Sequence, residues 1–179
     1  MPVIKGVPRF HIIRLSPFHR KASVKSRDLN VVVLVIHQHG VAGFTGIAHT
    51  RWATHGVPND QNAHPHMDST GTIAVVHNGI IENYATIKQN LLKKGHEFRS
   101  ETDSEVLVHF IEDIQQELNC SLEEAVRLGL QEVVGAYAIV IMSEDEPTQL
   151  IAARRSSPLV IGVGENEFFF ASDATPIIE

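Results

Sequence analysis

The chain has 179 residues, of which 43% are hydrophobic and 20% are charged, and its formal net charge is −6. This composition is typical of a soluble globular protein, and the length fits one domain with a real core. We predict a cytoplasmic protein, because no apolar run approaches the roughly 18 residues of a membrane span, the N-terminus lacks a secretory signal, and the single cysteine, Cys120, excludes an internal disulfide.

The charge is distributed unevenly along the chain. Residues 1–40 contain seven basic residues and one acidic residue, whereas the remainder contains 8 basic and 20 acidic residues. Such a step suggests two segments of different character. We expect residues 1–40 to be a basic leader, disordered or foreign to the domain, and residues 41–179 to form the functional domain. A basic arm can bind nucleic acid or a membrane surface, but this one has no interleaved aromatic pattern and no clear basic helix, so we expect neither partner.

The pattern of apolar residues before Asn78 predicts strands. Residues 1–29 show no usable period, because three prolines interrupt them. Apolar, β-branched runs predict buried strands, and they place strands at 31–36, 46–52 and 72–77, with a turn over 37–43 and a loop over 55–68. Asn78-Gly79, directly after the third strand, is a strong turn signal.

Helical spacing follows, and then more strands. Apolar periodicity predicts a helix over 82–94, and a short strand over 96–99. The pairs Thr102 with Glu105 and Ser121 with Glu124 predict capping boxes that begin two further helices, the last of which runs to about residue 134. Strands are expected at 135–142, 150–153, 159–163 and 167–171. This order predicts an α+β fold with helices packed on antiparallel sheets.

Three segments concentrate polar side chains: residues 45–56, 77–83 and 100–105. A buried strand seldom carries so many donors and acceptors unless its end binds something. We therefore expect the three segments to meet at one small-molecule site. The alternative is that they are ordinary turns and helix caps.

The residue types in these segments suit an α-amino acid with an acyl group. Arg51 can hold a carboxylate with two parallel hydrogen bonds, and Asp103 can pair with an ammonium group. Asn78 and Gly79 offer an amide and a backbone N–H, the elements of an oxyanion hole. The alternatives are that Arg51 pairs with a local acid, that Asp103 only stabilises the first turn of its helix, and that Asn78-Gly79 is a plain turn.

Neither a metal site nor a nucleophile is evident from the sequence. Residues 45–83 contain five histidines, at His49, His55, His64, His66 and His77. They lack the thiolates of a structural zinc site and a carboxylate at a familiar spacing, so we expect no metal and no cofactor. Ser156 and Ser157 have no nucleophile-elbow pattern, and Cys120 precedes a helix-capping serine, where a thiol is usually inert.

Seven motifs occur in register along the chain. They are TGIAHTRWATHG (45–56), NAHPH (62–66), HNGIIEN (77–83), ETDSE (101–105), GAYA (135–138), ARRSSPLVIG (153–162) and ASDATP (171–176). Together they resemble the glutaminase domain of glucosamine-6-phosphate synthase (glutamine–fructose-6-phosphate transaminase, isomerizing), a class II glutamine amidotransferase. Amidophosphoribosyltransferase has the same general layout.

The resemblance implies an N-terminal-nucleophile hydrolase fold of αββα type, which we expect to be incomplete at both ends of this chain. It implies glutamine hydrolysis, with ammonia passed to a separate isomerase domain that binds fructose-6-phosphate. The implied pathway is amino-sugar synthesis towards UDP-N-acetylglucosamine, and the full-length family protein is expected to be a homo-oligomer.

The resemblance also implies roles for individual residues. Arg51 would hold the substrate α-carboxylate and Asp103 its α-ammonium. Asn78 and Gly79 would form the oxyanion hole. The remaining assignments place Thr54 and His55 in the pocket and Trp52 beside the ammonia route.

Two departures from the family pattern concern its N-terminal cysteine nucleophile, whose own α-amine acts as base. Here the sequence begins Met1-Pro2-Val3, and the family stretch RGYDSAG is absent. We therefore expect this chain to be inactive in glutamine hydrolysis. One alternative is a non-catalytic amino-acid-binding module. Another is that Pro2, once Met1 is removed, is a catalytic secondary amine.

Overall fold

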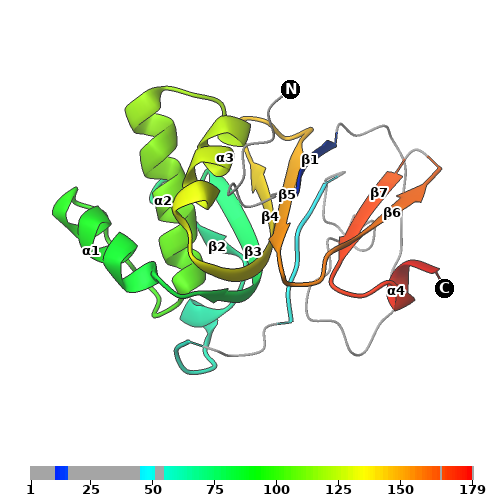
Figure 1. Cartoon of the computed structure of the whole chain (residues 1–179), viewed down its shortest axis with the longest axis horizontal. Coiled ribbons are helices and arrows are strands. Elements are labelled where there is room, and N and C mark those ends of the chain that lie inside the picture. Colours follow the sequence, from blue (N-terminus) through cyan, green and yellow to red (C-terminus); the bar gives the residue numbers. More distant parts are fainter. Residues whose placement is uncertain (1–10, 16–44, 51–54, 166, 179) are drawn as a thin grey trace, which may run out of the picture.

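The computed structural model describes residues 11–15, 45–50, 55–165 and 167–178 (Figure 1). The strand expected over 31–36 and the turn over 37–43 lie outside these residues. In the described part, helices pack on one face of an antiparallel sheet and a β-hairpin lies on the other face (Figure 1). The α+β prediction is therefore confirmed.

The main sheet has five strands in the order β1-β5-β4-β3-β2, and every pairing is antiparallel. Its strands are β1 (His11–Leu15), β2 (His66–Met67), β3 (Ile73–Ile81), β4 (Gly135–Ser143) and β5 (Leu150–Arg155). The long central pair β3 and β4 places Ile73 opposite Ser143 and Ile81 opposite Gly135. Strand β1, which the sequence did not predict, pairs with β5 along its whole length.

Three helices cover one face of this sheet (Figure 1). They are α1 (Tyr84–Lys93), α2 (Asp103–Leu118) and α3 (Leu122–Glu132). The hydroxyl of Thr102 accepts the Glu105 N–H at 3.2 Å and that of Ser121 accepts the Glu124 N–H at 3.3 Å, so both predicted N-caps are confirmed. Among the described helices, none is long and apolar enough to cross a membrane.

Strand alternation divides the core into two layers. Side chains such as Val75, Ile139 and Ile151 pack against Leu107 and Ile111 of α2. The alternate positions face the opposite way, where a second apolar cluster forms around Phe170. Strands β3 and β4 are apolar on both faces because both faces are covered.

The second cluster lies under a two-stranded antiparallel sheet, β6 (Val160–Gly164) and β7 (Glu167–Ala171). A single helical turn, α4 (Thr175–Ile178), follows β7. The described layers are therefore helices, sheet and sheet. Within the described ranges, α4 is the only helix on the hairpin side, where the expected αββα arrangement has a full second helical layer.

Three local predictions were wrong. Asn78-Gly79 is not a turn, because β3 continues through it and pairs these residues with Ala138 and Tyr137. Residues 96–99 form no strand, because a carboxylate rather than a neighbouring strand accepts the N–H groups of Arg99 and the next residue. Of the strand expected over 46–52, the described residues 46–50 contain only a bridge residue at Ala48.

Candidate functional site

The candidate site lies along the second half of β3. Strand β2 pairs only with Ala74 and Val75 of β3. Along the same edge of β3 from His77 onwards, the described contacts come from side chains rather than from a neighbouring strand. The N–H of His77 donates to Nδ1 of His64 at 3.4 Å, and the N–H of Ile81 donates to Oδ2 of Asp103 at 2.8 Å. Because N–H groups alternate along a strand, the N–H of Gly79, midway between these two, is directed to the same edge.

Asp103 is a buried carboxylate at the first position of α2, only 3% exposed. The helix N-terminus favours a negative charge there. Its Oδ1 atom lies 3.9 Å from Nδ1 of His55 and 3.5 Å from the hydroxyl of Ser104. Within the described ranges, its ion-pair contacts are with histidines and none is with lysine or arginine. The site therefore presents a buried anion that can receive a cationic group.

His77, which lies on β3 itself, does not supply a positive charge for Asp103. His77 is buried, and its Nδ1 lies 2.9 Å from the hydroxyl of Ser104. Burial lowers the pKa of His77 from 6.5 to about 4, although the Asp103 carboxylate acts in the opposite direction. The imidazole is therefore neutral near pH 7, and it adds no positive charge beside Asp103.

Asn78 is oriented by a histidine. Its Oδ1 atom lies 2.9 Å from Nε2 of His49. An amide oxygen can only accept, so Nε2 of His49 is the donor. The amide NH₂ of Asn78 has no hydrogen-bond partner within the described ranges, and it is available to a ligand oxygen.

The loop before β2 and the first residue of β2 itself anchor the start of α2, a role that the sequence did not reveal. Asn62 accepts the N–H of Glu101 at 2.9 Å, and Nε2 of His66 lies 3.0 Å from the hydroxyl of Thr102. All five histidines that invited a metal interpretation contact the start of α2 or one another. His55, His64, His66 and His77 each lie against one of the residues 102–104, and the ring of His49 lies 4.3 Å from that of His64. The NAHPH motif was the only sequence feature that could have indicated this role, but the residues near the start of α2 with which it forms hydrogen bonds lie 36 to 40 positions later in the sequence.

The structure brings together four of the predicted site residues: Asn78 and Gly79 on β3, Asp103 on α2, and His55 beside Asp103. The other three, Arg51, Trp52 and Thr54, lie outside the described residues.

The single thiol is remote from this group. Cys120 follows the end of α2 and packs against the helical core. A helix of 16 residues is about 24 Å long at 1.5 Å per residue, so α2 separates Cys120 from Asp103.

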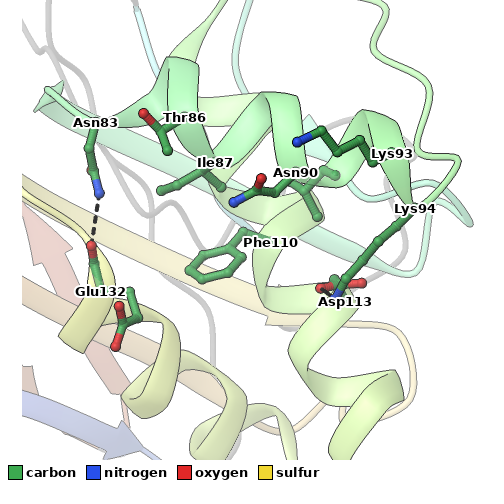
Figure 2. Close-up of a pocket in the computed structure, with 10 residues that line it drawn as sticks. Asn83, Thr86, Ile87, Asn90, Lys93, Lys94, Phe110, Asp113 and Glu132 are labelled. Carbon is green, nitrogen blue, oxygen red and sulfur yellow. Dashed lines mark hydrogen bonds and ion pairs between the residues drawn. The ribbon is translucent and has the colours of Figure 1, made fainter.

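A separate cavity of about 620 Å³ lies between α1, α2 and the end of α3 (Figure 2). Ile87, Leu91 and Phe110 form its apolar wall, and its rim includes Lys94 and Glu132. None of the four grouped site residues lines it. This cavity belongs to the helical layer and is not the candidate site.

Comparison with known proteins gives one consistent family. Residues 49–179 match the model of the glutamine amidotransferase domain. The chain is 56% identical over 144 residues to the glutamine–fructose-6-phosphate aminotransferase (isomerizing) of Bacteroides thetaiotaomicron, covering 80% of this chain and 24% of that protein. It is 58% identical over 163 residues to the enzyme of the same name from Chlorobaculum tepidum, covering 89% and 26%. The chain thus spans about a quarter of the length of these relatives.

Solved structures agree with this assignment. The glutamine phosphoribosylpyrophosphate amidotransferase of B. subtilis aligns with a TM-score of 0.63 and 30% identity over 76% of this chain and 29% of that one. An allosteric regulatory enzyme of purine biosynthesis aligns with a TM-score of 0.56 and 30% identity over 65% of this chain and 25% of that one. These likenesses confirm the expected N-terminal-nucleophile hydrolase fold. With the family model covering most of its length, the chain belongs to the glutamine amidotransferase domain family.

Proposed function

We propose that this chain is the glutamine-binding part of a class II amidotransferase. The observation that carries the proposal is the buried Asp103 carboxylate, which faces an open strand edge without a lysine or arginine partner in the described structure. In this proposal the α-ammonium group of glutamine pairs with Asp103. The amide carbonyl of its side chain accepts from Asn78 and from the N–H of Gly79.

The spacing along β3 suits glutamine. Asp103 binds the N–H of Ile81, and Gly79 lies two residues earlier on the same strand. That separation is about 6.6 Å, close to the span of an extended glutamine from its α-nitrogen to its amide oxygen. Asparagine is one methylene shorter and cannot reach both positions, so the proposal predicts selectivity for glutamine.

The remaining roles follow the family resemblance. Arg51 binds the α-carboxylate, Thr54 and His55 line the pocket, and Trp52 borders the ammonia route. In the longer protein, ammonia from glutamine reaches a domain that acts on fructose-6-phosphate. That reaction feeds amino-sugar synthesis towards UDP-N-acetylglucosamine in the cytoplasm, and the full protein is a homo-oligomer. The names of the relatives, which are glutamine–fructose-6-phosphate aminotransferases, support the two proposed substrates.

Binding without hydrolysis is the behaviour that this chain's own residues favour. The family mechanism needs a thiol at the reacting carbonyl, and the one cysteine of the sequence is Cys120, at the far end of α2. We therefore propose that these 179 residues bind glutamine without hydrolysing it.

The test combines calorimetric titration of L-glutamine with an assay for glutamate release. We expect saturable binding, weaker binding of asparagine, and no release above a blank. Asp103→Asn keeps an acceptor for Ile81 but removes the charge, and should weaken binding by about 30-fold or more, as loss of a buried charge partner does. The matched control Asp145→Asn, on an exposed loop, should bind like the wild type.

Each outcome separates the two parts of the proposal. Absence of binding in the wild type, or equal binding in both variants, would overturn the glutamine site. Glutamate release that disappears in Asp103→Asn but persists in Cys120→Ser would confirm the site and overturn the non-catalytic role.

A further inference from the structure

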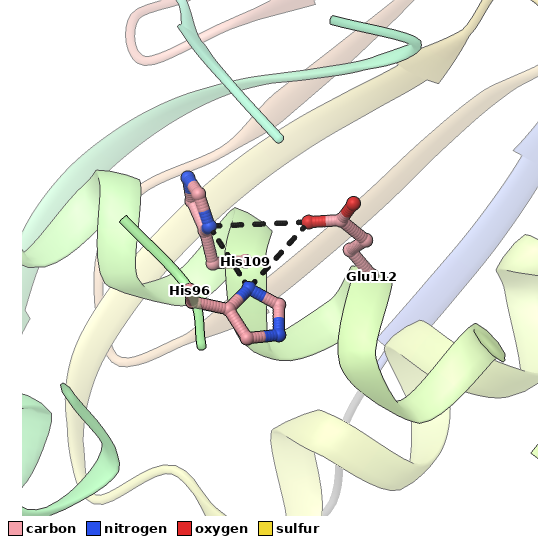
Figure 3. Close-up of side chains that lie close together, drawn as sticks. All are labelled: His96, His109 and Glu112. Atoms are coloured by element: carbon pink, nitrogen blue, oxygen red, sulfur yellow. Dashed lines mark hydrogen bonds and ion pairs between the residues drawn. The ribbon is translucent and has the colours of Figure 1, made fainter. Parts of the chain in front are cut away.

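We propose that His96, His109 and Glu112 bind one divalent transition-metal ion, such as Zn²⁺, and so fasten the segment after α1 to helix α2. His96 lies in the connection between α1 and α2, whereas His109 and Glu112 are three residues apart on one face of α2. Figure 3 shows the three side chains converging from these two elements. None of them belongs to the proposed glutamine site, so this inference is independent of that function.

The distances between the three potential ligand atoms fit a metal ion. Nδ1 of His96 lies 3.1 Å from Nδ1 of His109, and the same two atoms lie 3.8 and 3.9 Å from Oε2 of Glu112. The point equidistant from all three is about 2.1 Å from each, which is the length of a Zn–N or Zn–O bond. The side chains therefore need little rearrangement to coordinate an ion.

The chemistry of the three groups also suits a cation. Glu112 is only 2% exposed, and within the described ranges its ion-pair contacts are with these two histidines alone. Two imidazole nitrogens and a buried carboxylate are a common ligand set for Zn²⁺.

The surroundings hold the ligands in place. Ser69 donates its N–H to Oε2 of Glu112 at 3.0 Å and its hydroxyl to Oε1, and Gln116 donates to Oε1 at 3.1 Å. Nε2 of His96 lies 3.6 Å from Oδ1 of Asp113, where a carboxylate can orient a ligating imidazole. Hydrogen-bonded outer partners of this kind are typical of metal ligands.

An ion can reach the site from solvent. A cavity of about 570 Å³ is lined by both His96 and His109, together with the acids Asp68 and Glu105. The lining has four acidic residues against the two basic residues Lys94 and Arg99, which favours cations, and the cavity has room for a water molecule as the fourth ligand. The site thus has an entry path and an open coordination position.

The expected consequence is structural. Glu112 lies nine residues after Asp103 on α2, which is about 13 Å along the helix. An ion bound there touches neither substrate nor the reacting atoms. It restrains the 96–102 segment, which leads into the cap of α2, and therefore stabilises the fold.

The experiment uses the full 179-residue chain, freed of metal with a chelator and then titrated with Zn²⁺ in competition with a chromophoric chelator. We expect one tight site per chain. His96→Gln, a substitution in the α1–α2 connection, and Glu112→Gln should each weaken it by more than the 10- to 100-fold that loss of an outer partner costs, so by about 100-fold or more. Glu117→Gln, at an exposed position of the same helix, is the matched control and should bind Zn²⁺ like the wild type.

A second readout detects the structural effect. Zn²⁺ at about 100 times its Kd should raise the Tm of the wild type by roughly 5–10 °C, and should leave the Tm of His96→Gln nearly unchanged. Co²⁺ should give the visible absorption of a four-coordinate site in the wild type only. Equal Zn²⁺ affinity in the wild type and His96→Gln would overturn the proposal and would show that the two imidazoles form an ordinary hydrogen bond. Should Glu112→Gln fail to fold, the comparison of His96→Gln with Glu117→Gln decides the question alone.

Discussion

Glu105 is the carboxylate on which the geometry around Asp103 depends most directly. It is buried, and it accepts three hydrogen bonds from the segment before α2: the N–H of Arg99 at 2.8 Å, the N–H of Ser100 at 2.7 Å and the hydroxyl of Ser100 at 2.6 Å. We predict that Glu105→Gln strongly destabilises the protein although the two side chains have nearly the same shape. It should also weaken glutamine binding, because Asp103 is the first residue of α2 and closely follows the segment that these bonds hold.

The size of the destabilisation follows from the number of hydrogen-bond donors that face Glu105. A glutamine amide offers one oxygen, so its NH₂ meets the N–H of either Arg99 or Ser100 and leaves that buried group unsatisfied. An unsatisfied buried N–H costs about 1–3 kcal/mol, and the other bonds lose the strength that the charge gave them. We expect a loss of about 2–4 kcal/mol in the free energy of unfolding.

The chain contains a matched control at the same helical position. Glu124 follows its capping residue Ser121 by three residues, as Glu105 follows Thr102. Glu124, however, lies at the surface, with 42% of its side chain exposed, and it pairs only with Arg127 in the described structure. Surface pairs of this kind contribute little, so Glu124→Gln should leave the stability unchanged within error.

Urea unfolding followed by circular dichroism measures both variants. The midpoint of Glu105→Gln should fall while the m-value stays constant, as expected for a change in stability alone. A Glu105→Gln midpoint that falls no further than that of Glu124→Gln would show that the three hydrogen bonds do not hold the segment, and the reasoning would fail.

Three further predictions rest on single residues. The free energy of unfolding should decrease as the pH falls from 6.5 to about 4, because the unfolded state binds a proton that buried His77 rejects. This residue contributes a slope of up to about 1.4 kcal/mol per pH unit, so the slope should be smaller by that amount in His77→Asn, and parallel curves would contradict the prediction. Gly79→Ala should cost about 3–5 kcal/mol, since its Cβ would lie 2.0 Å from the Ala136 carbonyl oxygen, whereas Gly71→Ala, also at positive φ but with nothing within 4 Å, should cost far less; equal losses in urea unfolding would refute the steric argument. Tyr137→Phe should raise the stability by about 1 kcal/mol, because the buried hydroxyl has no partner in the described structure; a lower melting temperature would count against this.

Much of the fold could be predicted from local pattern. Helix α2 begins where Thr102 and Glu105 predicted it, and the strands from β4 to β7 lie within about two residues of their expected ranges. These elements have strong apolar periodicity or caps, which depend on neighbours in sequence. Strand β1 lacks such a signal, because an edge strand is held by backbone pairing to β5, and no pattern within His11–Leu15 requires it.

The candidate site likewise contains residues that local sequence could indicate and residues whose roles depend on tertiary contacts. Residue chemistry predicts that Asp103 pairs with an ammonium group, and the structure places its carboxylate against the N–H of Ile81 on β3. The roles of Glu105 beyond its cap, and of His66 at the α2 terminus, rest on contacts that only the folded chain creates. The same holds for His96 and His109, which are 13 residues apart and meet because the connection after α1 folds back against α2.

The clearest failure of local reasoning is also informative about the site. Asn78-Gly79 has the composition of a tight turn, yet it lies within β3 because glycines on two paired strands permit a close approach. A Cβ on Gly79 would lie 2.0 Å from the carbonyl oxygen of Ala136, and one on Gly135 would lie 2.1 Å from that of Ile80. Both residues also have φ values, +125° and +137°, that side chains disfavour. Gly79 is therefore required because β4 approaches it too closely for a side chain, and not because the backbone forms a turn there. The proposed oxyanion donors therefore belong to the long central strand pair of the sheet, which holds them in a fixed geometry before a ligand arrives.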